Sequence, residues 1–329
     1  MRDGKLTEPV YKRSVLRQLK NSLCNDKTGG PSCFGALELA NDEVLATAVA
    51  SYAIDADKSI WFAIHLAVNK LAATNGMTKP LAIALSVFLP AELEEQELKK
   101  MMCTVDDICT HLHIKLIDID IQVTPVVVGF PIFTVTAYGS LKKDDTRKLA
   151  GARPGQDIVV TKSIGLEGVA ILAIEEEAKL LKRYTPTFIY QAQAFANYAS
   201  ILREVAVAVM HGATAMRAVQ QGGILAALWE FAGESNVGLT VDLKHIPIKQ
   251  ETVEICEFFG YNPYQLASAG SLIVATDDGF GLVRKLEAEG IAASVIGKIT
   301  DSNDKVILRD EETRYIDLPG MDEIYKSRD

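Results

Sequence analysis

Cysteine is scarce in this chain, and its spacing excludes the usual cysteine sites. Five cysteines occur among 329 residues, and no two of them form a Cys-x-x-Cys pair. Disulfide-stapled secreted proteins and zinc ribbons carry a denser and more regular pattern than this. We therefore expect reduced thiols and a cytoplasmic protein.

Long apolar runs are also missing. Residues 81–89 form one apolar stretch, which Pro90 closes, and residues 123–137 form another, which proline and glycine interrupt. Both are shorter than the roughly 20 residues that cross a bilayer. The first five residues are mostly charged and lead into no apolar segment. We therefore expect neither a secretory signal nor a membrane partner.

Positive charge is in deficit. The chain has 34 Lys and Arg against 43 Asp and Glu, a formal net charge of −9. Nucleic-acid-binding proteins concentrate basic residues on one face, because phosphate contacts dominate their affinity. The balance argues against a nucleic-acid partner. It also means that a polyanion such as ATP needs local compensation by lysine, backbone N–H groups or a metal ion.

The common short motifs of phosphate binding and catalysis are absent. The sequence contains no G-x-x-x-x-G-K-[ST], no G-x-G-x-x-G, no H-E-x-x-H and no G-x-S-x-G. The five histidines are scattered, and His111 and His113 are typical of a solvated helix end rather than of a metal site. No reaction follows from motifs alone.

The composition is that of a globular protein with two α/β domains. Apolar residues make up 48% of the chain and charged residues 23%. A chain of this length exceeds one ordinary core. Residues 141–156 are charged and rich in glycine and proline, as expected of a linker. We predict an N-terminal domain of residues 1–145 and a C-terminal domain of residues 146–329.

Hydrophobic periodicity predicts the order of elements. In the first half, after a short helix at 11–23, it predicts strands at 34–40, 44–52, 81–89, 114–123 and 131–139, and helices at 57–74 and 90–112. In the second half it predicts strands at 157–161, 237–242, 271–276, 292–299 and 305–309, and helices at 166–183, 187–210, 222–232, 250–259 and 280–289. Each half therefore mixes strands with helices.

Several segments of the second half occur in an order that resembles a known family. Residues 155–168, GQDIVVTKSIGLEG, read as a strand, a loop and a helix start, and residues 216–230 carry a Gly-Gly pair at a helix start. Segments 246–263, 269–272 and 296–299 follow. In this order they resemble the aminoimidazole ribonucleotide (AIR) synthetase-like superfamily, closest to the AIR synthase-related proteins near the hydrogenase maturation factor. The similarity covers essentially the whole chain.

The resemblance implies a two-domain α/β (α+β) AIR synthase-like fold in which helices cover one side of each mixed sheet. It also implies a homodimer joined through N-terminal strands. In the family, ATP binds to the N-terminal domain, whose acids hold Mg²⁺, and phosphorylates an amide-type or comparable oxygen. The positions of this sequence that the resemblance assigns to the nucleotide cleft are Ser51, Asn69, Lys70, Asp118, Asp120, Lys162, Gly165, Gly222 and Gly223.

This sequence departs from the family at the metal-binding acids. Four of the five acidic positions are lost, and they carry Ser32, Ala50 beside Ser51, Lys70 in the pair Asn69-Lys70, and Ala218 with Gln221. Only the position of Asp118 and Asp120 keeps an acid. Mg²⁺ binding is therefore doubtful, and ATP stays a candidate ligand only. The chain end also lacks the terminal cysteine that carries the substrate in the hydrogenase factor.

Structural interpretations stand beside these assignments. Gly165 marks a helix start, Gly222 and Gly223 fit close backbone packing, and Asp118 and Asp120 fit an edge strand with one wet face. Lys162 also fits a solvated lysine at a strand end. The sharpest hypothesis is that Lys70 pairs with Asp120 or Asp118 near the vacated magnesium site, against the alternative that it points to solvent.

Two main functions and one weaker alternative remain open at this point. The first is a degenerate family member, non-catalytic or weakly active, that binds a nucleotide or a protein partner. The second is an ATP-dependent enzyme with a rebuilt site. A third option is a subunit that works with an active paralogue. The missing acids favour the first, since a shared fold indicates a shared reaction only weakly.

Overall fold

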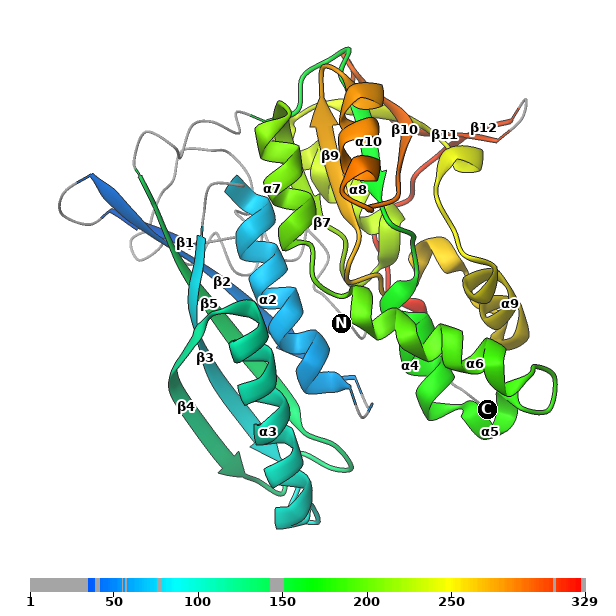
Figure 1. The fold of residues 1–329 in the computed structure, drawn as a ribbon. Helices are drawn as coiled ribbons and strands as arrows, with labels where there is room; N and C mark the ends of the chain where they lie inside the picture. Colours follow the sequence, from blue (N-terminus) through cyan, green and yellow to red (C-terminus); the bar gives the residue numbers. More distant parts are fainter. Residues whose placement is uncertain are drawn as a thin grey trace.

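Two mixed β-sheets with associated helices organise the chain (Figure 1). The computed structural model describes residues 35–38, 42–54, 56, 58–75, 79–142, 151–309 and 312–326. The first sheet lies within residues 35–142 and the second within residues 157–315. The domain boundary predicted between residues 145 and 146 lies outside the described residues, as do Ser32 and the predicted helix at 11–23.

The first sheet has five strands in the order β1-β2-β5-β3-β4. They are β1 (Gly35–Glu38), β2 (Glu43–Tyr52), β5 (Ile132–Lys142), β3 (Lys79–Leu89) and β4 (Lys115–Val123). β3 and β4 are parallel and the other neighbours are antiparallel. Helices α2 (Ser59–Asn75) and α3 (Glu95–Leu112) pack on one face, where the alternating apolar residues of the strands are buried. All seven predicted elements are confirmed here.

The second sheet has seven strands in the order β12-β11-β8-β10-β6-β9-β7. They are β12 (Glu312–Tyr315), β11 (Lys305–Arg309), β8 (Gly238–Asp242), β10 (Ala293–Thr300), β6 (Asp157–Thr161), β9 (Leu272–Thr276) and β7 (Ala213–Ala218). The remaining elements are α4 (Leu166–Glu175), α5 (Glu177–Leu180), α6 (Pro186–Gln193), η3 (Ala194–Tyr198), α7 (Leu202–Met210), α8 (Gly223–Ser235), η4 (Leu243–His245), α9 (Gln250–Phe259), η5 (Pro263–Gln265), α10 (Gly279–Ala288) and η6 (Glu323–Tyr325).

Helices cover both faces of the second sheet, so the prediction of a one-sided cover is wrong for it. Every residue of β6 and β9 is buried. Ile158 and Val160 join a core with α8, whereas Val159 joins a core with α7 and α10. A strand that is apolar on both faces needs an apolar neighbour on each side, and the sequence of β6 has no polar alternation.

Two predicted helices are interrupted. The helix predicted at 166–183 breaks at Glu176 into α4 and α5. The helix predicted at 187–210 is three pieces, α6, η3 and α7, with a break at 199–201. Strand β7 was not predicted, because its sequence ATAMRA contains few of the residues that favour strands.

Helix α2 joins the two sheets. Its residues Ala72 and Ala73 are buried in the core that β6, β9 and α7 form, and small side chains permit this close approach. Trp61 Nε1 donates to the carbonyl of Ala196 (3.0 Å), and Gln220 Nε2 donates to the carbonyl of Leu66 (3.3 Å). These contacts along α2 therefore fix how the first sheet packs against the C-terminal elements.

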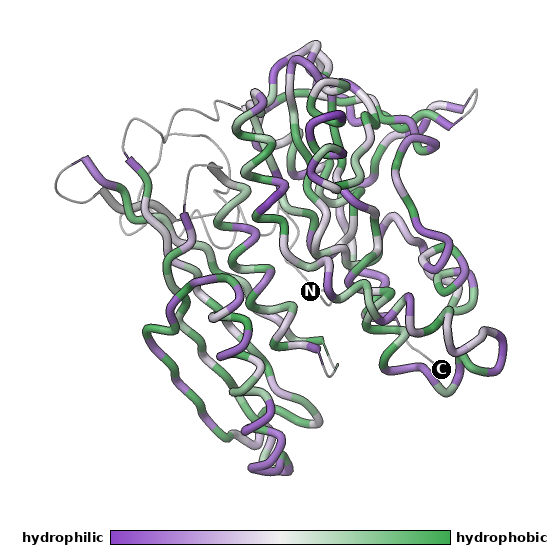
Figure 2. Tube along the Cα trace, viewed as in Figure 1, coloured by the Kyte–Doolittle hydropathy of each residue, from purple (hydrophilic) through white to green (hydrophobic). Residues whose placement is uncertain are grey.

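Strand β4 is an exposed edge. All nine of its residues are exposed, and Figure 2 shows apolar and polar residues alternating along it. Its register with β3 places Asp118 beside Ala84 and Asp120 beside Ser86. The edge-strand interpretation of the two aspartates is therefore confirmed, although both faces of the strand are wet rather than one.

The described residues contain no helix with the length and apolar character needed to cross a bilayer. Cys103, Cys109 and Cys256 are free thiols. Cys24 and Cys33 lie outside the described residues. The cytoplasmic location stays a prediction.

One buried histidine on α2 makes the fold sensitive to acid. His65 is 2% exposed, and neither ring nitrogen has a hydrogen-bond partner among the described residues. Its ring contacts that of Trp61 in a tilted arrangement, with 4.8 Å between centroids. Burial lowers the pKa of His65 to about 3, with the charges of His111 and Lys162 acting in the same direction.

We expect His65 to reduce stability as the pH falls. Its pKa is lower in the folded protein (about 3) than in the unfolded chain (6.5), so stability is complete above pH 6.5 and declines below it. The loss amounts to about 2 kcal/mol at pH 5. Urea unfolding at pH 5 and pH 8 measures it. His65→Leu removes this part of the pH dependence, and the exposed His211→Leu is the matched control. An unchanged pH dependence in His65→Leu contradicts the prediction.

Candidate functional site

Three loops of the C-terminal elements converge where they meet α2 and β2. They are residues 162–165 after β6, residues 219–223 before α8 and residues 266–271 before β9. Gly165 N donates to Ser268 Oγ (2.8 Å), and Gly168 N donates to the carbonyl of Ala267 (2.9 Å). The three loops and the residues that contact them, including 322–325, are called the seam below.

A buried carboxylate connects β2 to this seam. Glu167 lies in the first turn of α4 with no solvent exposure. It accepts hydrogen bonds from Tyr52 Oη (2.8 Å) and from Ala269 N (3.0 Å). Burial raises the pKa of Tyr52 well above its usual value, and the neighbouring Glu167 charge adds to the effect. Tyr52 is therefore a neutral donor that holds the end of β2 against the 266–271 loop.

A buried ion pair lies at the start of the 162–165 loop. Lys162 Nζ lies 2.7 Å from Glu204 Oε1, and their side chains are 16% and 4% exposed. The same ammonium donates to the carbonyls of Tyr198, Ser200 and Gly270 at 2.6–3.0 Å. Burial lowers the pKa of Lys162, and the Glu204 carboxylate opposes that shift. Lys162 is therefore neither solvated nor free to hold a phosphate, and the solvated interpretation is wrong.

The start of α8 is capped by an acid from the far end of the chain. Asp322 accepts hydrogen bonds from Gly222 N, from Ala267 N (3.1 Å) and from Ile324 N (2.9 Å). Its side chain is buried, and burial raises its pKa to about 6 against the opposing effect of the three backbone donors. A helix N-terminus attracts anions. Here the anion is part of the protein, so an external anion reaches Gly222 N only by displacing Asp322.

Gly165, Gly222 and Gly223 allow this arrangement. All three have left-handed backbone angles, with φ of 72°, 85° and 64°. A Cβ on Gly223 would lie 2.5 Å from the carbonyl oxygen of Tyr264. The close-packing interpretation of Gly223 is therefore confirmed, and Gly165 is the N-cap of α4.

The predicted cleft residues of the first sheet have structural partners. Ser51 Oγ lies 3.2 Å from Thr134 Oγ1 on the exposed side of the sheet. Asn69 is 1% exposed, donates to the carbonyl of Ala199 (2.7 Å) and accepts from Ile201 N (3.1 Å). Both polar atoms of the Asn69 side chain are thus used to hold the break between η3 and α7.

The predicted pairing of Lys70 with Asp120 or Asp118 is wrong. Lys70 Nζ donates to the carbonyl of Val49 on β2 (3.0 Å). The two aspartates are on β4, which β5 and β3 separate from β2. The described residues contain no ion pair between Lys70 and either acid. The sequence prediction assumed that β4 lies at the same cleft as α2, whereas β4 is the far edge of the sheet.

The described residues do not fit the magnesium site that the resemblance implies. Ala50 and Ala218 have no ligand atoms in their side chains, and the side chains of Asn69 and Lys70 are bonded to backbone groups. Asp118 and Asp120 lie on the distant edge strand. Within the described part of the chain, no group of three or more His, Cys, Asp or Glu side chains is placed to hold a metal ion.

Sequence reasoning missed the acids that organise the seam. Glu167 and Glu204 stand out as single acids in otherwise apolar helix segments, which was the available signal. Asp322 gave no such signal, because its partners are 55 and 100 residues away along the chain. The structure brings Lys162, Gly165, Gly222 and Gly223 around the seam, but it leaves Ser51, Asp118 and Asp120 outside.

Comparison with known proteins finds a family that matches the C-terminal elements and relatives that match most of the chain. Residues 153–309 match the family described as AIR synthase related protein, C-terminal domain. A putative hydrogenase expression/formation protein of Methanocaldococcus jannaschii is 26% identical over 98% of this chain and 96% of that protein. The carbamoyl dehydratase HypE of Rhizobium leguminosarum bv. viciae is 26% identical over 72% of this chain and 67% of HypE.

Solved structures extend the likeness over both sheets. The hydrogenase maturation protein HypE in complex with ATP has a TM-score of 0.73 at 20% identity, covering 98% of this chain and 97% of HypE. The HypE–HypF complex has a TM-score of 0.73 at 19% identity, covering 93% and 100%. AaThiL complexed with AMPPCP and TMP has a TM-score of 0.71 at 17% identity, covering 95% and 96%. At these identities the likeness establishes the fold.

Proposed function

We propose that this chain, which belongs to the AIR synthase-like superfamily near the hydrogenase maturation proteins, is a non-catalytic or weakly active relative that binds a nucleotide or a protein partner. The proposal rests on the contacts made by the residues that occupy the predicted magnesium-binding positions. Asn69 and Lys70 are committed to backbone partners, and the remaining acids lie on a distant edge strand. A triphosphate held without such acids lacks the metal that neutralises its charge during phosphoryl transfer.

The ligand classes come from the relatives. One HypE structure contains ATP, another is a complex with HypF, and AaThiL is complexed with AMPPCP and TMP. A nucleotide and a protein partner are therefore the two ligands to test first. Calorimetric titration of the full chain with ATP, with and without Mg²⁺, tests the nucleotide. Affinity for ATP that does not increase with Mg²⁺ supports the proposal.

We expect magnesium-dependent ATP hydrolysis to be absent or very slow. The structural reason is the missing carboxylate set, since metal-bound phosphate supplies much of the transition-state stabilisation in this chemistry. A coupled assay for phosphate release measures it. Lys70→Asp is a useful control, because one restored acid leaves Ala50 and Ala218 without carboxylates and should not restore turnover. Turnover on the order of 1 s⁻¹, as in ordinary kinases, would instead establish an ATP-dependent enzyme with a rebuilt site.

We also propose a homodimer. The first sheet ends in the edge strands β1 and β4, and Ile117 and Val123 of β4 are 60% and 62% exposed. Apolar edge strands favour pairing with another chain. Light scattering at micromolar concentration should give twice the chain mass of 35.8 kDa. A monomer that forms a mixed complex with a paralogue would contradict the homodimer and support the subunit alternative.

A further inference from the structure

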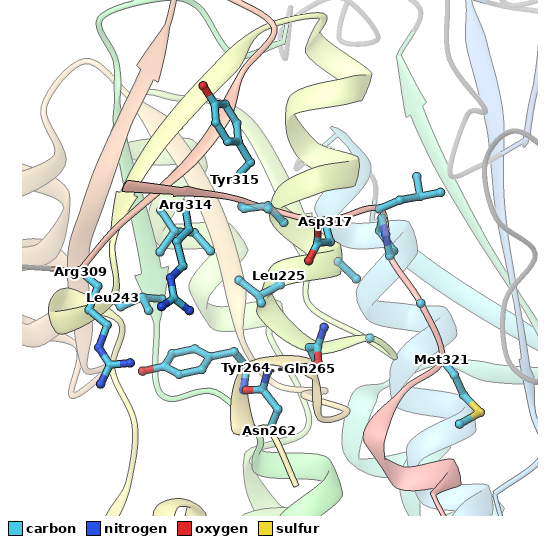
Figure 3. A pocket seen from close by; sticks show the side chains of 17 residues that line it. Leu225, Leu243, Asn262, Tyr264, Gln265, Arg309, Arg314, Tyr315, Asp317 and Met321 are labelled. Atoms are coloured by element: carbon cyan, nitrogen blue, oxygen red, sulfur yellow. Dashed lines mark hydrogen bonds between the residues drawn. The ribbon is translucent and has the colours of Figure 1, made fainter. Parts of the chain in front are cut away.

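A cavity of about 450 Å³ lies beneath the C-terminal strap, defined here as residues 312–321. The strap forms one wall, and the first turn of α8, residues of η4 and η5 and the end of β11 form the others (Figure 3). Gly222 is the point where this cavity borders the seam. Small-molecule sites in proteins are concave and of this size, with few polar groups on largely apolar walls.

Two polar groups lie at one end of the cavity without a hydrogen-bond or ion-pair partner among the described residues. The Arg309 guanidinium and the Tyr264 hydroxyl make no hydrogen bond or ion pair with any other part of the chain that the structure describes. Figure 3 shows both groups, with the Arg314 guanidinium, on the same side of the cavity. Burial raises the pKa of Tyr264, and the positive charge of Arg309 opposes that shift, so the two groups act on each other electrostatically. Arg314 is paired with Glu312 (2.8 Å).

The wall behind these groups is apolar. Leu225, Leu243 and Ile307 line it, and Ile307 is 8% exposed. Beyond them, Asn262 Nδ2 donates to Gln265 Oε1 (3.1 Å), which fixes both amides on η5. The cavity therefore combines a cationic end with an apolar wall, and the acid that lines it, Asp317, belongs to the strap.

We propose that this cavity binds a small organic anion, with an apolar or aromatic body against Leu225, Leu243 and Ile307 and a carboxylate or phosphate on Arg309. Arg presents a planar set of donors that matches both anionic groups, and the Tyr264 hydroxyl adds a neutral donor beside it. An apolar body without the anion would leave the arginine unused, and a bare anion would leave the apolar wall wet. The site is independent of the ATP proposal, because no residue of the predicted nucleotide cleft except Gly222 lines it.

Phenyl phosphate and benzoate are the probes for this site. Calorimetric titration of the full-length protein should show saturable binding of at least one of them, and the better one identifies the anionic group. Benzyl alcohol and inorganic phosphate each carry only half of the recognised chemistry, so both should bind at least tenfold more weakly. No saturable binding of either aromatic anion at millimolar concentration overturns the proposal, as does inorganic phosphate binding equally well.

Three variants locate the binding. Arg309→Gln should weaken the better probe at least tenfold, since it removes the positive charge and leaves a shorter side chain with a neutral amide. Tyr264→Phe removes only the hydroxyl and should weaken the probe severalfold. Arg284→Gln, an exposed arginine on α10, is the matched control and should leave binding unchanged. Wild-type affinity in Arg309→Gln, or an equal loss in Arg284→Gln, overturns the assignment.

Discussion

Replacing Lys162 with methionine is expected to lower the free energy of unfolding by about 3–5 kcal/mol, because it leaves the Glu204 carboxylate buried without its partner. The Glu204 side chain is 4% exposed, so water cannot replace the lost ammonium. The carbonyls of Tyr198, Ser200 and Gly270 lose their donor at the same time. Most of the cost is therefore the desolvation of groups left unpaired rather than the strength of the original pair.

A double variant tests that explanation. Lys162→Met with Glu204→Gln removes the buried charge together with its partner, so it should recover a large part of the loss. Lys99→Met is the matched control, since Lys99 pairs with Glu95 on the surface of α3 with side chains 67% and 78% exposed. Exposed pairs contribute about 0–1 kcal/mol. Urea unfolding of the four proteins gives the comparison, and equal losses in Lys162→Met and Lys99→Met would contradict it.

The ion pair also affects how the elements around the seam pack together. Two of the three carbonyls that Lys162 binds, those of Tyr198 and Ser200, lie on either side of Ala199, whose own carbonyl accepts from Asn69 on α2. Loss of Lys162 should therefore loosen the break between η3 and α7 and, with it, the contact of α2 with the C-terminal elements. Hydrogen exchange at Ile201 N, which donates to Asn69 Oδ1, reports this directly.

The local sequence pattern was sufficient to predict a helix or strand where neighbouring residues determine its structure. The strand at 157–161 and the helix at 250–259 have the predicted bounds, because their apolar spacing, caps and flanking turns act over a few residues. The segment 187–210 failed for the opposite reason. Its alanine-rich sequence favours one continuous helix, but Asn69 and Lys162 bind the backbone at 198–201 from distant parts of the chain.

The same limit explains the candidate site. The Gly-Gly pair predicted the start of α8, because left-handed glycines precede helices for local steric reasons. The acid that caps it, Asp322, comes from residues after the last strand, and no spacing rule connects positions 100 residues apart. The Lys70 hypothesis failed on strand order, since the parallel crossover through α3 places β4 at the edge rather than beside β2.

Replacing Gly223 with alanine is the second change that we expect to cause a large loss of stability, because two separate features of its position exclude a side chain. Its φ of +64° is left-handed, which costs other residues about 1–2 kcal/mol. A Cβ there would also lie 2.5 Å from the Tyr264 carbonyl oxygen and 2.9 Å from Leu266 N, both backbone atoms that cannot rotate away. Overpacking of this kind costs about 1–3 kcal/mol more. Gly223→Ala should therefore displace η5 or the first turn of α8.

A control variant at Gly260 separates the cost of the left-handed backbone from the cost of overpacking. It ends α9 with a φ of +70°, and a Cβ on it would meet no atom within 4 Å. Gly260→Ala should therefore lose only the left-handed cost of about 1–2 kcal/mol, and Gly223→Ala clearly more in the same urea titration. Because Gly222 N binds Asp322, the larger loss should also free the strap, which limited proteolysis near residue 320 would detect. Equal losses in the two variants, with the strap equally protected, would show that η5 yields to the added methyl group at no cost.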